Sequence, residues 1–125
     1  MDVIEQNDIA AVATILATDR TLLETRLPVR LPPRGVSAHA TPLVIAAAFG
    51  KLEIIHFLVE QGADVHVFKD KALRVSVKNG HLDVVRFLVE QGADVHIYED
   101  AALWLSALNG HLSVVRFLVE QGATG

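Results

Sequence analysis

The side chains of this chain that could perform acid–base or nucleophilic chemistry are not grouped as a catalytic site requires. The 125 residues include no Cys, which excludes a thiolate nucleophile, a disulfide scaffold and a thiolate zinc site. Glu60, Glu90 and Glu120 recur singly on an expected outer face rather than as a pair in a cleft. No Gly-rich loop follows a strand to hold a phosphate group. We therefore predict that the chain is not an enzyme and has neither a catalytic residue nor a cofactor.

The six His residues are the other candidates for chemistry, as metal ligands. His66 and His96 are thirty residues apart, as are His81 and His111, so each pair occupies equivalent places in a repeating unit. Stacked units would hold equivalent side chains roughly 10 Å apart, whereas each ligand of a zinc ion lies about 2 Å from it. We therefore predict that these His residues form local hydrogen bonds and bind no metal.

The composition is that of one folded domain outside the membrane. The chain is 51% hydrophobic, which is too apolar for a disordered protein. Its longest unbroken apolar stretch, residues 43–49, is far shorter than the roughly 20 residues of a spanning helix. The acidic N-terminus differs from a secretory signal and the absence of Cys fits a reducing compartment, so we expect a cytoplasmic protein. The net charge of −4 disfavours nucleic acid as a partner.

A thirty-residue repeat organises most of the chain. The block Phe-Leu-Val-Glu-Gln-Gly-Ala occurs three times, at residues 57–63, 87–93 and 117–123. Its spacing defines three repeats, at residues 41–70, 71–100 and 101–125. Each repeat contains two apolar segments with a helix-ending Gly between them, as at Asn79-Gly80. We predict helices at residues 42–49, 52–61, 72–78, 82–91, 102–108 and 112–121. No strand is expected at residues 63–70.

The repeated motifs resemble the ankyrin repeat. Gly-His-Leu-x-Val-Val-x-x-Leu begins at Gly80 and again at Gly110, and Gly-Ala-Asp-Val follows the second helix at Gly92. Thr41-Pro42-Leu43-x-x-Ala46 is similar to the opening motif of that family. Later repeats depart from it, with Lys71-Ala72 and Ala101-Ala102 in place of Thr-Pro.

The resemblance implies an all-α, ankyrin-type solenoid of about four stacked helix-turn-helix repeats. The finger loops between helix pairs should be short, because the period is thirty residues rather than about 33. Ser76 and Ser106 occupy places that the resemblance assigns to Ala, so we expect them to pack rather than react. The array is also similar to those of giant DNA viruses, which would place the protein in the host cytoplasm.

We interpret residues 1–125 as a single ankyrin-repeat domain. Residues 1–24 fit a degenerate N-terminal capping repeat, with small Ala11 and polar Thr14 at places that are apolar in the later repeats. Residues 25–40 contain three of the four prolines, three Arg and no acidic residue, and we predict an irregular Pro/Arg-rich loop. A docking peptide is the alternative for this loop, although its prolines miss the P-x-x-P spacing.

Partner binding in proteins of the resembled family uses the concave face, made by the finger tips and the exposed side of the first helices. On each first helix, positions i, i+3 and i+7 share a face, and these residues change completely between repeats while the seven-residue block does not. Packing explains the constant block, and a partner explains the variable positions, which include the only Trp. The predicted partner-binding residues are Phe68, Lys69, Lys71, Arg74, Lys78, Tyr98, Glu99, Trp104 and Leu108.

We therefore predict a non-catalytic protein–protein interaction module that binds a partner protein through its concave face. A regulatory subunit or inhibitor of an enzyme is the alternative, and single-stranded nucleic-acid binding by the cations beside Trp104 is a third class. The last predicted helix, residues 112–121, keeps the apolar residues of the interior copy, although a terminal repeat needs a polar outer face. We expect this face to be exposed and to mediate self-association, unless further repeats or a partner cover it.

Overall fold

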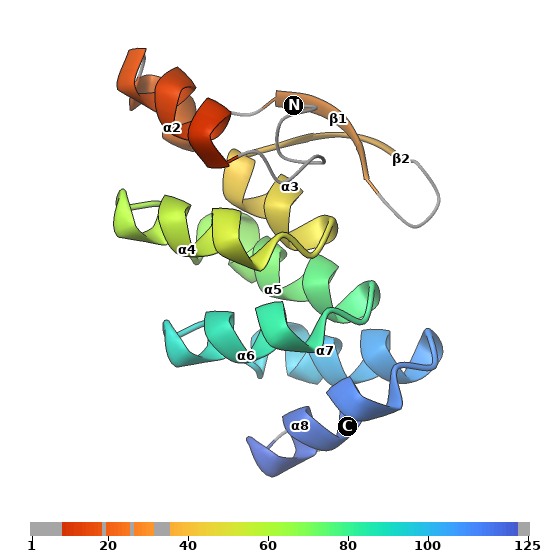
Figure 1. The fold of residues 1–125 in the computed structure, drawn as a ribbon. Helices are drawn as coiled ribbons and strands as arrows, with labels where there is room; N and C mark the ends of the chain where they lie inside the picture. Colours follow the sequence, from red (N-terminus) through yellow and green to blue (C-terminus); the bar gives the residue numbers. More distant parts are fainter. Residues whose placement is uncertain (1–8, 19, 26, 32–35, 123–125) are drawn as a thin grey trace. The chain divides into compact units, whose positions relative to one another are not determined.

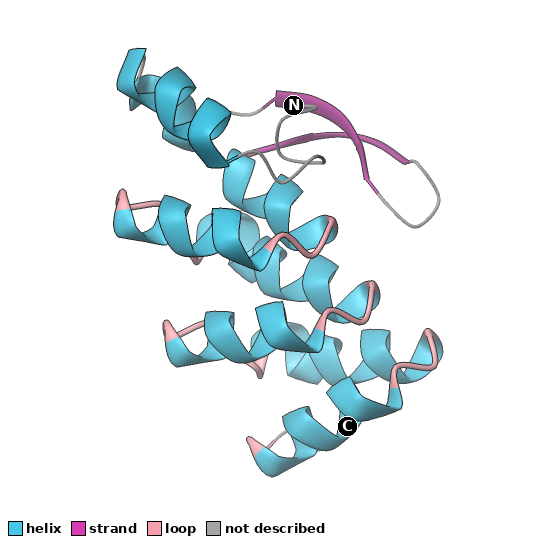
Figure 2. Ribbon diagram, viewed as in Figure 1, coloured by secondary structure: helices cyan, strands magenta, loops and turns pink. Residues whose placement is uncertain are grey.

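The computed structural model describes residues 9–18, 20–25, 27–31 and 36–122. The chain divides into two compact units, Met1–Asp64 and Val65–Gly125. Both units are built mainly from short helices joined by tight turns (Figures 1 and 2). No helix in the described part of the chain is long and apolar enough to cross a membrane.

In the first unit, a helix, a short 3-10 helix and a hairpin precede the first complete helix pair. Thr41 caps this pair, because its hydroxyl accepts a hydrogen bond from the Val44 amide at 3.5 Å and Pro42 occupies the first helical turn. The Glu24 carboxylate accepts a hydrogen bond from the Asp64 amide at 3.0 Å, which ties the 3-10 helix to the end of the unit. The elements are α2 (Ile9–Thr18), η1 (Arg20–Glu24), β1 (Leu27–Leu31), β2 (Val36–Ala40), α3 (Pro42–Ala48) and α4 (Leu52–Glu60).

The prediction of an irregular loop at residues 25–40 is wrong for two segments of it, β1 and β2, which form an antiparallel hairpin (Figure 2). Leu27 of β1 pairs with Ala40 of β2, and Leu31 pairs with Val36. Apolar residues alternate along both segments, which is the signal of a strand. The prolines nearby favoured the prediction of a loop instead. Pro28 is compatible with a strand here because the sheet has two strands, so each strand has a free edge.

In the second unit, two helix pairs pack against each other. The first helices α5 and α7 lie side by side, each packs on its own second helix, and α6 also contacts α8. Leu73, Val77 and Val85 are fully buried, as are Leu88 and Leu118. The elements are α5 (Val67–Lys78), α6 (Leu82–Glu90), α7 (Ile97–Leu108) and α8 (Leu112–Glu120).

The predicted helix limits at residues 42–49, 52–61, 82–91 and 112–121 agree with α3, α4, α6 and α8 to within one residue. The first helices α5 and α7 extend back to Val67 and Ile97, but residues 68–70 are left-handed, so the right-handed part of α5 begins within one residue of the predicted start at residue 72. Residues 63–70 contain no strand, as predicted. The expected first helix of the capping repeat lies in residues 1–8, outside the described residues, while α2 occupies the place expected for its second helix.

Candidate functional site

The finger at the start of α5 contains a left-handed helical turn. Phe68, Lys69 and Asp70 have φ angles of 54°, 57° and 54°. Each non-Gly residue in this conformation costs about 1–2 kcal/mol, so three in succession require support from their surroundings. The first support is the buried Asp70 carboxylate, which lies 2.6 Å from His66 Nδ1.

Arg74 supplies the second support for this turn. Its Nε donates a hydrogen bond to the Lys69 carbonyl at 3.0 Å, and its Nη2 donates one to the Phe68 carbonyl at 2.7 Å. The planar guanidinium therefore holds two successive carbonyl groups of the left-handed turn. Arg74, predicted from its place on the helix face to meet a partner, turns toward its own finger, and its role in the site is to position Phe68 and Lys69.

The finger at the start of α7 repeats the His–Asp contact but has no arginine. His96 Nδ1 lies 2.6 Å from Asp100 Oδ1, and the φ of Asp100 is 66°. The place of Arg74 is taken by Trp104, whose indole carries a single N–H donor and cannot hold two carbonyl groups. The side chains of Tyr98 and Glu99, which we predicted to contact the partner, lie outside the described residues.

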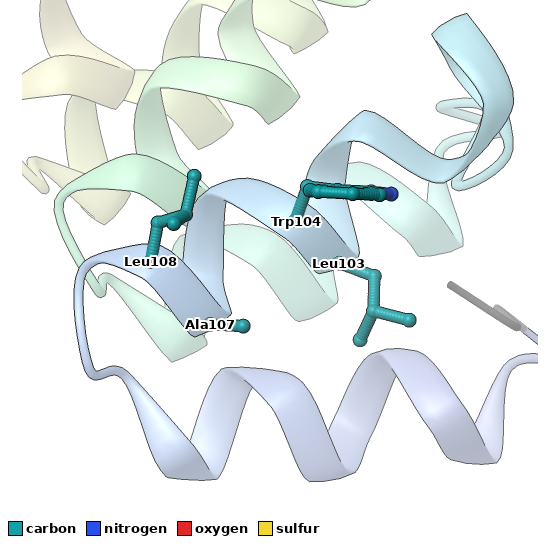
Figure 3. Close-up of a pocket in the computed structure, with 4 residues that line it drawn as sticks. All are labelled: Leu103, Trp104, Ala107 and Leu108. Carbon is teal, nitrogen blue, oxygen red and sulfur yellow. The ribbon is translucent and has the colours of Figure 1, made fainter.

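Trp104 and its neighbours on α7 form an open apolar hollow. Trp104 is 58% exposed and Leu108 is 77% exposed, which is unusual for side chains of this size. The hollow is about 430 Å³ in volume and is lined by Leu103, Trp104, Ala107 and Leu108. Figure 3 shows Leu103 and Ala107 on the side of α7 toward α8, and Trp104 and Leu108, the next residues around the helix, turned away from α8. One continuous apolar strip of α7 is therefore available to a partner.

Lysine residues stand near this hollow, on the neighbouring helix α5. Lys69 is exposed, and Lys71 and Lys78 are half-buried. Trp104 and Leu108 occupy the places that Arg74 and Lys78 occupy one repeat earlier, and α5 packs against α7. The predicted residues on these two helices are thus at equivalent places on adjoining helices of one unit.

The His and Ser residues that were tested for chemistry have packing roles. His66 and His96 hold the finger aspartates, and His111 Nε2 donates a hydrogen bond to the Lys78 carbonyl at 2.9 Å. The hydroxyls of buried Ser76 and Ser106 donate to carbonyl groups one turn back, at 2.8 and 2.9 Å. The described residues include no group of three His, Cys, Asp or Glu side chains that could hold a metal ion.

The outer face of the last helix pair is a second apolar surface. Leu112 is 61% exposed and Val119 is 54% exposed, and a further hollow of about 270 Å³ is lined by Ala107, Gly110, His111, Leu112 and Val115. In the preceding pair, the equivalents Val77 and Val85 of Ala107 and Val115 are fully buried, and the equivalents Leu82 and Val89 of Leu112 and Val119 are half-buried. The predicted exposure of the outer face of α8 is therefore confirmed.

Comparison with protein families identifies the repeat. A family model described as ankyrin repeats (3 copies) matches residues 12–99 and residues 43–124. This chain belongs to the ankyrin-repeat family. Its fold is the predicted one, an all-α ankyrin-type repeat solenoid, to which the β1–β2 hairpin is added. A search of curated protein sequences finds no match.

Ankyrin repeats are generally protein–protein interaction modules and are typically non-catalytic. Two parts of this ankyrin-repeat site were missed in the sequence, the structured finger itself and its support by Arg74. The support by Arg74 was missed because spacing along a helix identifies a face but not what lies over it. The His–x–x–x–Asp spacing, present at both His66 and His96, is the signal that could have indicated a structured finger.

Proposed function

We propose that this ankyrin-repeat protein binds a partner protein through the first-helix face of its second unit, which comprises Phe68, Lys69, Lys71, Lys78, Trp104 and Leu108. The observation that carries the proposal is the exposure of Trp104 in an apolar hollow, since Trp is the side chain most enriched at the centre of interfaces. We propose the cytoplasm as the place of action, which the absence of Cys supports.

The mechanism follows from the rigidity of the finger. Phe68 and Lys69 are held by the hydrogen bonds from Arg74 before any partner arrives, so little conformational entropy remains to be lost on binding. Trp104 and Leu108 project from a helix that is fixed by its packing against α5 and α8. The surface is therefore preorganised, with an apolar centre and charged side chains around it.

Substitution of Trp104 tests this function. The chain and its Trp104→Ala variant are immobilised and used to capture proteins from a lysate, which are identified by cross-linking and mass spectrometry. Trp104→Ala should weaken partner binding by about 2 kcal/mol or more, or about 30-fold, the scale of an interface hot spot. Its thermal unfolding should change little because most of the side chain is in solvent.

Val119→Ala is the matched control, since Val119 is similarly exposed, at 54%, but lies on α8 and is not among the residues that line either hollow. This variant should capture the same partner as the unsubstituted chain. If Trp104→Ala mainly lowers the melting temperature, or if both variants bind the partner equally well, the proposed surface is wrong. Should the captured partner be an enzyme, its activity with and without the chain decides between an inhibitor and a simple binding module.

A further inference from the structure

We infer that the segment recognised by this surface is an acidic peptide with an apolar anchor residue, an inference that rests on the proposed function and makes its chemistry specific. Two features of the second unit point to it, the lysines of α5 and the hollow of α7. Because α5 packs against α7 and their residues occupy equivalent places, a single extended segment can reach both features.

The charge on α5 requires a negatively charged complement. Lys69, Lys71 and Lys78 form no ion pair with any residue that the structure describes. The described carboxylates of α5 and α7, Asp70 and Asp100, each lie 2.6 Å from a His and are largely buried. A chain with a net charge of −4 thus carries three lysines on one helix with no carboxylate among the described side chains paired to them, and an acidic partner provides electrostatic complementarity.

The hollow on α7 requires an apolar complement. Its lining residues, Leu103, Trp104, Ala107 and Leu108, include no charged side chain, and its volume of about 430 Å³ has room for a large apolar residue. Leu108 is the repeat equivalent of Lys78, so the anchor and the nearest lysine are about one interhelix distance apart, or roughly 10 Å. An extended peptide covers that distance in about three residues. The expected motif therefore has an acidic residue about three positions from an apolar one.

Nucleic acid fits this surface less well than a peptide does. Affinity for nucleic acid comes from several cations that follow the phosphate backbone. Here the lysines are confined to α5 and its finger, and the places of Lys71 and Lys78 are taken in α7 by Ala101 and Leu108. The apolar lining of the hollow, with three aliphatic side chains beside Trp104, suits a Leu or Phe side chain.

Selection from a short random peptide library, displayed and captured by the full chain, tests the inference. Affinities of the selected peptides are then measured by fluorescence of Trp104, which is the only Trp of the chain and lies in the hollow. The selected peptides should be acidic, with an apolar residue about three positions from an acid. Lys71→Glu/Lys78→Glu should weaken their binding about tenfold or more at low salt, and less at high salt, where surface charges are screened.

Lys51→Glu/Arg116→Glu is the matched control, because it makes the same change in net charge on α8 and before α4. Binding by this variant should fall less than about twofold. The inference is overturned if the selected peptides are neutral or basic, if no peptide is selected, or if Lys71→Glu/Lys78→Glu binds them as the control does. It is equally overturned if single-stranded oligo-dT binds more tightly than the acidic peptides.

The same variants separate this inference from the proposed function. If Trp104→Ala loses the captured partner while Lys71→Glu/Lys78→Glu keeps it, the surface binds protein but does not select acidic segments. If neither variant changes capture, both the proposed function and the acidic motif are wrong. Thermal unfolding of each variant identifies any loss of binding that comes from loss of the fold.

Discussion

Arg74 Nη2 donates a hydrogen bond to the carbonyl oxygen of Phe68 at 2.7 Å, which fixes a helix side chain to a finger residue six positions earlier. The same guanidinium donates to the carbonyl of the next residue, Lys69. A turn of three left-handed residues at the end of one repeat is thereby stabilised by the first helix of the next repeat. Arg74 therefore affects the proposed binding surface indirectly, because it holds the backbone from which the side chains of Phe68 and Lys69 project.

Arg74→Ala should lower the free energy of unfolding. The variant loses two hydrogen bonds from a charged donor and leaves the left-handed turn without one of its supports, so we expect a loss of about 1–2 kcal/mol for this partly exposed side chain. Urea unfolding measures the loss, and hydrogen exchange should increase at residues 68–70. Arg74→Lys should recover little of the stability, because an ammonium cannot hold two carbonyl groups in a fixed plane. Equal stability of all three proteins would show that the turn does not depend on Arg74.

Trp104→Arg should stabilise the second unit and remove partner binding. The finger at the start of α7 has the same His–Asp contact as the finger at the start of α5, and an Arg at residue 104 would stand where Arg74 stands. Two new hydrogen bonds to finger carbonyls would add about 1 kcal/mol to the free energy of unfolding. The measurement is a melting curve alongside the capture experiment. A variant that unfolds earlier than the unsubstituted chain would show that the two fingers are built differently.

The two glycines that join the helices of each pair in the second unit should differ in their tolerance of a side chain. Gly80 and Gly110 have nearly the same φ, 75° and 74°. A Cβ at Gly80 would lie 2.5 Å from His111 Nδ1, whereas a Cβ at Gly110 meets nothing within 4 Å. Gly110→Ala should therefore cost only the strain of a left-handed residue, about 1 kcal/mol.

Gly80→Ala should cost more than Gly110→Ala, because the His111 ring must move and its hydrogen bond to the Lys78 carbonyl is then lost. We expect about 2–3 kcal/mol in total, from the strain and the lost bond together. Urea unfolding of the two variants under the same conditions measures the difference. Equal costs would mean that His111 adjusts freely and does not help to hold the two helix pairs together.

Local signals in the sequence were sufficient for most helices of this fold. The ends of α3 and α6 are set by Gly residues and by the spacing of apolar side chains, which act within a few residues along the chain. The β1–β2 hairpin was missed because strand pairing joins residues that are up to thirteen positions apart, such as Leu27 and Ala40, and prolines obscured the alternation.

The candidate site was predictable in its location and less so in its detail. Trp104 was identified because its position differs in every repeat, whereas the seven-residue block is the same in all three. That contrast is visible in the sequence alone. The left-handed turn was not predictable, because Phe68 and Lys69 have no intrinsic preference for positive φ and adopt it through contacts with Arg74. Leu103 and Ala107 were missed because their exposure depends on the absence of a covering helix pair in the described residues.

The outer face of α8 should mediate self-association of this chain. Leu112, Val115 and Val119 share one side of the helix, with exposed Arg116 at the edge of that side. The apolar part of this face is complementary to itself, so two copies related by a two-fold axis can cover it while Arg116 stays in solvent. Sedimentation velocity at tens of micromolar should therefore detect a dimer, and Leu112→Glu should weaken it about tenfold or more by placing a charge in the interface.

The residue chosen for this test matters because the apolar side chains of α8 are not all equally accessible. Phe117 is half-buried and the Arg86 guanidinium lies 5.4 Å from the centre of its ring, so Phe117→Glu would disturb the contact between α6 and α8 as well as any dimer. Leu112 is 61% exposed, and its replacement leaves that contact intact. Glu53→Lys, a charge change at an exposed residue of α4, should leave the dimer unchanged. A chain that sediments as a monomer at these concentrations, identically to its Leu112→Glu variant, would contradict self-association through α8.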